Sequence, residues 1–220
     1  MLTLVGLLLL PLAIIGAQLA TGANGGLANA AYKLAFIVPP VVYCRVHGIH
    51  IGRDILRWRN WRNDLGLSLA IGLIAASLFL ALYGAVGHLL IDKATIAAKI
   101  HEQFSVTAGT VLLIAPFTIV INSLIEEFFY RGFAFGLIAQ RRPLLAILLP
   151  ATVFTAQHLM FAYHWVGPGT VTIGVVALFV FSLVTQFMYH KADTIVAPWI
   201  IHICGDLAMM AIAVELIYRN

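Results

Sequence analysis

Runs of about 20 apolar residues recur along this 220-residue chain, and no other feature restricts its folding so strongly. A helix of about that length crosses the hydrocarbon core of a bilayer, and a backbone inside lipid must satisfy its own hydrogen bonds. Hydrophobic residues make up 62% of the chain and charged residues only 10%, against about 25% charged residues in soluble domains. We therefore predict an all-α, polytopic integral membrane helix bundle and exclude an ordinary soluble domain.

The apolar runs predict about seven transmembrane helices, with a range of six to eight. They cover residues 1–19, 27–44, 65–91, 107–140, 144–163, 170–189 and 194–218. Pro39 and Pro40 should kink or divide the second helix, because proline removes a backbone hydrogen bond. The fourth run exceeds one bilayer thickness, so it must tilt, protrude or break, with Pro116 as one position for a break. Residues 92–106 are expected to form a short polar link.

A basic segment at about residues 45–64 separates the second and third helices. It combines five arginines with Trp58 and Trp61, a mixture typical of the headgroup interface, where it would anchor the chain to anionic lipid. Helix alternation places Arg141, Arg142 and Lys191 on the same side of the membrane as this segment. Because basic residues favour the cytoplasmic side, we predict that this segment and the N-terminus are cytoplasmic and that the membrane is the cell membrane.

The chain shows no internal repeat and no linker that would divide it into independent domains. We predict one structural domain with two parts, N-terminal transmembrane helices in residues 1–106 and a second part in residues 107–220. The basic residues are sparse, so nucleic acid is not an expected partner, whereas the lipid bilayer is. The sequence defines no oligomeric state.

A charged side chain deep in a bilayer is costly, so each ionisable residue within an apolar run is a functional candidate. We select six such residues from three runs: Glu126, Glu127 and Arg131 in the fourth, His158 in the fifth, and His202 and Asp206 in the seventh. Lys33 also lies within an apolar run, the second, and is counted only among the basic residues. Counting from the basic residues at the predicted cytoplasmic ends puts Glu126, His158 and His202 about 17 to 24 Å deep. The three helices can therefore bring these side chains to one level.

Residues four apart share a helix face, and this spacing relates Glu127 to Arg131 and His202 to Asp206. We assign Glu127 to an ion pair with Arg131 and Glu126 to chemistry, since adjacent side chains point about 100° apart. Asp206 is expected to orient the His202 imidazole. A carboxylate and two histidines can bind a divalent metal that activates water, or can activate water directly as a general base.

Three motifs in this order resemble those of a known family. Glu126-Glu127-Phe-Phe-Tyr-Arg131 resembles its EExxxR motif, Phe154-Thr-Ala-Gln-His158 its FxxxH motif and His202-Ile-Cys-Gly-Asp206 its HxxxN/D motif. This is the CPBP family, also called Abi, of CAAX prenyl proteases of the Ras-converting-enzyme type and bacteriocin-processing proteins. The resemblance extends over about residues 107–218 and implies that residues 107–220 form the catalytic core.

The resemblance implies an intramembrane endopeptidase in which Glu126 and His158 activate water. His202 and Asp206 would then bind a metal such as Zn²⁺ or stabilise the oxyanion, and Glu127 and Arg131 would support the site. The same resemblance is compatible with a metalloprotease, with Glu126, His158, His202 and Asp206 as ligands, and with a metal-free glutamate protease. Its substrates would be prenylated CAAX proteins, bacteriocin-like peptides or other membrane proteins.

Asp206 departs from the prenyl-protease branch, which usually has Asn at this position. An ionised Asp cannot donate a hydrogen bond to an oxyanion, so Asp206 favours a role in orienting His202 or binding metal. Two other classes remain open: a transporter or proton relay that uses the buried acids and histidines, and a non-catalytic scaffold that binds a membrane protein. Against transport, the chain shows no inverted repeat.

Overall fold

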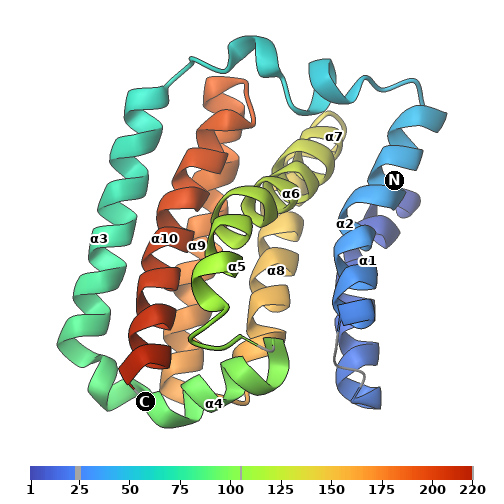
Figure 1. The fold of residues 1–220 in the computed structure, drawn as a ribbon. Coiled ribbons are helices and arrows are strands. Elements are labelled where there is room, and N and C mark those ends of the chain that lie inside the picture. Colours follow the sequence, from blue (N-terminus) through green and yellow to red (C-terminus); the bar gives the residue numbers. More distant parts are fainter. Residues whose placement is uncertain (23–25, 105, 220) are drawn as a thin grey trace.

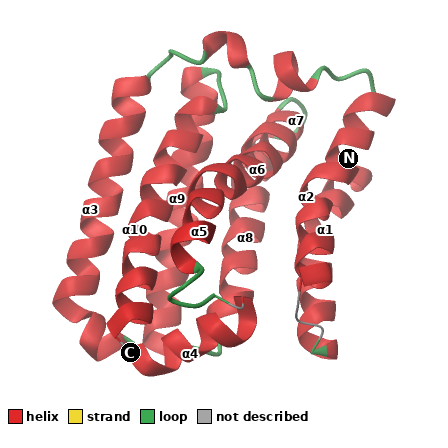
Figure 2. Ribbon diagram, in the orientation of Figure 1, coloured by secondary structure: helices red, strands yellow, loops and turns green. Residues whose placement is uncertain are grey.

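The computed structural model describes residues 1–22, 26–104 and 106–219, without the side chains of residues 26–31, 103, 104, 161 and 219. Within these ranges the regular structure is entirely helical (Figure 2). The longer helices are α1 (Leu2–Thr21), α2 (Gly26–Val46), α3 (Leu65–Leu90), α4 (Lys93–Phe104), α8 (Pro143–Ala162), α9 (Pro168–Ala192) and α10 (Val196–Arg219). A composite helix between α4 and α8 consists of α5 (Val111–Pro116), η3 (Phe117–Asn122), α6 (Ser123–Glu127), η4 (Phe128–Phe135) and α7 (Gly136–Ala139).

Six helices among the described residues are long and apolar enough to span a membrane. They are Leu2–Thr21, Leu65–Leu90, Val111–Ala139, Pro143–Met160, Pro168–Ala192 and Val196–Tyr218. The second predicted span corresponds to α2, which lies beside α1 and is not among the six (Figure 1). The prediction of an all-α polytopic bundle with six to eight spans is confirmed.

Helix α10 occupies the centre of the bundle, because it packs against α3, α9, α6 and η3 (Figure 1). Helix α8 lies between α9 and α1, and α1 and α2 form a pair at the edge. Helices α3 and α10 approach each other closely at Gly72, where a Cβ atom would lie 2.8 Å from Cys204 Sγ and 3.2 Å from Ile201 Cα. Glycine at this position therefore allows the two backbones to meet.

The composite helix crosses the bundle obliquely, with α6 and α7 inclined to α5 (Figure 1). Pro116 does not break it; instead two stretches, η3 and η4, have wider π-helical turns. Such turns are rare and occur frequently at functional sites, because they change the direction in which side chains point. All eight residues of η4 are buried, so this stretch is part of the core of the molecule.

Two segments differ from the expectation. Helix α2 continues through Pro39 and Pro40, so these prolines do not divide it. The predicted polar link contains helix α4, which Asp92 caps by accepting hydrogen bonds from the Ala94 amide at 3.1 Å and the Thr95 hydroxyl at 2.7 Å. The bond from Thr95 holds the pKa of Asp92 below its usual value, so the cap stays ionised.

Candidate active site

Glu126 lies in the middle of the bundle, at the end of α6, and is 3% exposed. Its Oε1 accepts a hydrogen bond from Asn122 Nδ2 at 3.0 Å, one helical turn earlier. Its Oε2 has no hydrogen-bond partner among the described residues and lies 3.5 Å from His158 Nε2 and 4.0 Å from His202 Nε2. One carboxylate oxygen is thus held in place while the other faces two imidazoles.

Glu127 points away from Glu126 and forms the ion pair that the spacing predicted. Its Oε1 lies 3.1 Å from Arg131 Nη1, and both side chains are completely buried. Arg131 Nη2 also donates to Ser182 Oγ on α9 at 3.2 Å, and its guanidinium lies 4.4 Å from the centre of the Phe154 ring. This pair therefore connects the composite helix to both α8 and α9.

His158 comes from α8 and is fixed by its own helix. Its Nδ1 lies 2.9 Å from the carbonyl oxygen of Phe154, the residue four positions earlier. A carbonyl only accepts, so Nδ1 carries the hydrogen and Nε2 keeps a lone pair directed toward Glu126. The Phe154 ring lies 4.2 Å from the imidazole between centres, which restricts its rotation.

His202 comes from α10, and Glu127 rather than Asp206 orients it. Its Nδ1 donates to Glu127 Oε1 at 2.7 Å, whereas its Nε2 lies 3.7 Å from Asp206 Oδ1, too far for a hydrogen bond. The expectation that Asp206 orients this imidazole is therefore wrong in its geometry. Glu127 accepts the Nδ1 hydrogen, so Nε2 of His202 faces Glu126 and Asp206, with a lone pair in the neutral ring and a hydrogen in the imidazolium form.

Lys33 of α2 is a site residue that the sequence analysis did not select. Its Nζ is hydrogen-bonded to Asn122 Oδ1 and lies 3.6 Å from Glu126 Oε1, and its side chain is 33% exposed. Lys33 is a basic residue within an apolar run, but no helical spacing relates it to the three motifs. The rule that a charge inside a membrane helix needs a partner was the one available signal.

The six residues chosen from the sequence thus lie in one cluster, with Lys33 and Asn122 at its edge. Four atoms that accept hydrogen bonds when both rings are neutral converge there: Glu126 Oε2, His158 Nε2, His202 Nε2 and Asp206 Oδ1. Acceptors that face one another without a donor repel, so the geometry suits an occupant that supplies hydrogens or positive charge. A water molecule, a proton or a metal cation would meet this requirement.

The donor set fits a divalent metal in chemistry, since neutral imidazoles and carboxylates are ordinary zinc ligands. The separations of 3.5 to 4.0 Å between neighbouring donors are wider than the roughly 3.3 Å edge of a tetrahedral zinc site. In the described part of the chain, no group of three or more His, Cys, Asp or Glu side chains has a geometry that could hold a metal ion.

Residues 108–208 match a family described as Rce1-like, the type II CAAX prenyl endopeptidases. This segment of the chain is similar to that family. The match contains Glu126, Glu127, Arg131, His158, His202 and Asp206, so it confirms the resemblance that the three motifs predicted. Lys33 lies outside the Rce1-like segment. No curated protein and no solved structure matches the chain.

Proposed function

We propose that this chain is an intramembrane endopeptidase that hydrolyses a peptide bond of a membrane-associated substrate with water activated by Glu126. The observation that carries the proposal is the 3.5 Å separation of Glu126 Oε2 and His158 Nε2. Both atoms can accept, so one water molecule beside the pair can donate a hydrogen bond to each from the side. Its oxygen lone pairs are then free to attack a carbonyl carbon.

In this mechanism the water oxygen bonds to the carbon of the scissile amide, and the water proton passes to Glu126. The carbonyl oxygen becomes an oxyanion, which a protonated His202 would stabilise by donating from Nε2. Glu126 then gives its proton to the amide nitrogen, the carbon–nitrogen bond breaks, and a carboxylic acid and an amine leave. The ion pair of Glu127 with Arg131 contributes by holding His202 in position.

If a divalent metal such as Zn²⁺ is bound, Glu126, His158, His202 and Asp206 would hold it. It would supply a Lewis acid that polarises the carbonyl or activates the water. In either case the residues of this chain bind the substrate bond, exclude lipid and move the proton at Glu126 Oε2. Prenylated CAAX peptides are the substrate class named by the Rce1-like family, and we propose them together with other membrane-bound peptides.

The test compares purified wild-type protein in detergent with Glu126→Gln and His158→Ala on farnesylated and unmodified CAAX peptides. We expect each variant to lose activity by roughly 10²- to 10⁴-fold while its thermal unfolding stays close to wild type. Glu102→Gln is the matched control, because Glu102 is an exposed carboxylate paired with Lys99 on α4. Its activity should be unchanged.

Two results would contradict the proposal. Full cleavage by Glu126→Gln would remove the carboxylate from the mechanism. A folded wild-type protein that cuts no peptide but conducts protons in vesicles would favour a transporter instead.

Loss of cleavage with a chelator, restored by Zn²⁺, would assign a metal to the same residues.

A further inference from the structure

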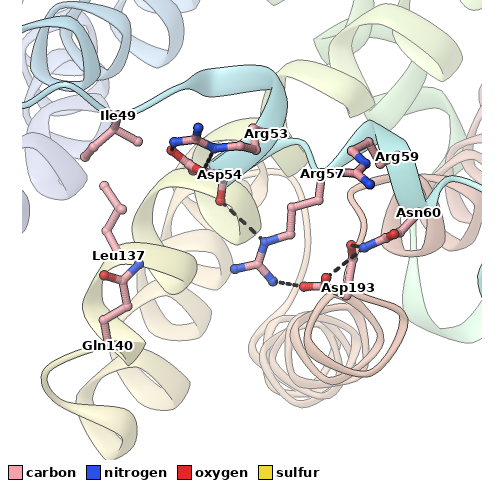
Figure 3. A pocket seen from close by; sticks show the side chains of 9 residues that line it. All are labelled: Ile49, Arg53, Asp54, Arg57, Arg59, Asn60, Leu137, Gln140 and Asp193. Carbon is pink, nitrogen blue, oxygen red and sulfur yellow. Dashed lines mark hydrogen bonds and ion pairs between the residues drawn. The ribbon is translucent and has the colours of Figure 1, made fainter.

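A cavity of about 550 Å³ lies at the end of the bundle where the basic segment crosses it. The segment contains η1 (Ile51–Ile55) and η2 (Trp58–Asn60), and it covers α7 and the turn between α9 and α10 (Figure 1). Arg53, Arg57 and Arg59 contribute to the polar wall, and Ile49 and Leu137 give an apolar side (Figure 3). None of these residues belongs to the candidate active site.

The polar wall of this cavity is held by a network that joins distant parts of the chain. Arg57 Nη1 lies 2.5 Å from Asp193 Oδ1, and Asn60 Nδ2 donates to Asp193 Oδ2 at 2.8 Å (Figure 3). Both Arg57 and Asp193 have left-handed backbones, with φ of 51° and 54°, a conformation that non-glycine residues adopt at a cost. The ion pair keeps these two turns together.

Further contacts fix the basic segment to the turn between α9 and α10. The Ile195 amide donates to the Leu56 carbonyl at 3.0 Å, and the Tyr189 hydroxyl donates to the Ile55 carbonyl at 2.7 Å. Lys191 is paired with Asp64. The cavity is therefore part of the folded structure rather than a gap beneath a loose loop.

The two aspartates of the cavity are already neutralised by neighbours. Arg53 contacts Asp54 with Nε at 2.7 Å and Nη2 at 3.0 Å, and these bonds lower the pKa of Asp54 to about 2. Asp193 is held by Arg57 and Asn60, as described above. Arg59, by contrast, has no hydrogen-bond or ion-pair partner among the described residues, although its side chain borders the cavity (Figure 3). One positive charge is therefore left without a counterion.

We propose that this cavity binds a phosphate group, that of an anionic membrane lipid, with Arg59 as its principal contact. A planar guanidinium matches two phosphate oxygens, and the unpaired Arg59 supplies the charge. The apolar wall at Ile49 and Leu137 suits the glycerol and first methylene groups of a lipid. Trp58 and Trp61, 38% and 46% exposed, flank Arg59 and Asn60 in the sequence and are residues typical of the headgroup level.

The test uses delipidated protein in detergent and follows its unfolding temperature as lipid is added. Dioleoyl phosphatidylglycerol, dioleoyl phosphatidylcholine and inorganic phosphate are titrated separately. We expect phosphatidylglycerol to stabilise the wild type saturably, phosphatidylcholine to do so much less, and Arg59→Gln to weaken phosphatidylglycerol binding on the order of tenfold. Arg62→Gln is the matched control, because Arg62 lies over the Trp61 ring and does not border the cavity.

Equal weakening by Arg59→Gln and Arg62→Gln would overturn the proposal, since it would show only general attraction to a basic surface. Equal binding of the two lipids would overturn it as well. Saturable binding of inorganic phosphate without any effect of phosphatidylglycerol would assign the cavity to a free phosphate group and refute the lipid source. Arg59→Lys keeps a charge without the planar fork, so it should weaken binding less than Arg59→Gln.

Discussion

The buried pair of Glu127 and Arg131 gives the most direct test of how this fold is stabilised. The perturbation is Arg131→Met, which keeps an unbranched side chain of similar length and removes the charge. In the structure the Arg131 side chain is fully buried, 3.1 Å from Glu127 Oε1 and 3.2 Å from Ser182 Oγ. The variant therefore leaves the Glu127 carboxylate inside the bundle without its guanidinium, and among the described residues His202 is its remaining hydrogen-bond partner.

Breaking a buried ion pair from one side costs about 3 to 5 kcal/mol, because the remaining charge stays desolvated. For a chain of this size, 1 kcal/mol corresponds to a shift of about 2 to 4 °C in unfolding temperature. We therefore expect Arg131→Met to unfold roughly 6 to 20 °C below the wild type. Glu127→Gln should be destabilised similarly, and the double variant should lose less than the sum of the two.

The assay is thermal unfolding of all variants in one detergent, followed by tryptophan fluorescence. Arg62→Met serves as the control, since Arg62 is exposed, and should change stability by less than about 0.5 kcal/mol. An Arg131→Met shift no larger than that of the control would refute a buried, paired Arg131. Strict additivity in the double variant would show that the two charges do not interact.

Two further predictions concern helix contacts that only the structure reveals. Lys33→Met removes the cation 3.6 Å from Glu126 and should lower kcat on the order of ten- to hundredfold, whereas Lys33→Arg should retain part of the activity. Unchanged peptide cleavage by Lys33→Met would exclude an electrostatic role of Lys33. Gly72→Ala places a Cβ atom 2.8 Å from Cys204 Sγ and near the α10 backbone, so it should destabilise the protein by about 1 to 3 kcal/mol in thermal unfolding. Gly66→Ala is the control, because Gly66 has open space around it, and it should not destabilise the protein.

The membrane helices were predictable because their signal is local. Span length follows from the rise of a helix and the thickness of the bilayer, so the predicted run 65–91 and helix α3 (Leu65–Leu90) nearly coincide. Helix α4 was missed because its sequence lacks an apolar run, and it is organised instead by the polar cap at Asp92.

Six residues of the candidate site were predictable from the sequence, but the contacts between them were not. Spacing within one helix gave the pair of Glu127 with Arg131, because four residues complete about one turn. The same reasoning assigned Asp206 to His202. In the structure, however, His202 Nδ1 bonds to Glu127 on another helix, and His202 Nε2 lies 3.7 Å from Asp206, too far for a hydrogen bond. Competition between two acceptors depends on helix placement, which spacing does not contain.

Local sequence patterns are enough to predict a helical membrane protein with acids and histidines at one depth. The cost of burying a charge in lipid and the helical repeat are both properties of residues close together in the chain. Tertiary structure decided the partners that come from far along the chain. It brings Lys33 to Glu126, turns His202 toward Glu127 and pairs Arg57 with Asp193. These contacts depend on how helices cross and on which glycines let backbones approach, and such geometry is fixed only when the whole bundle packs.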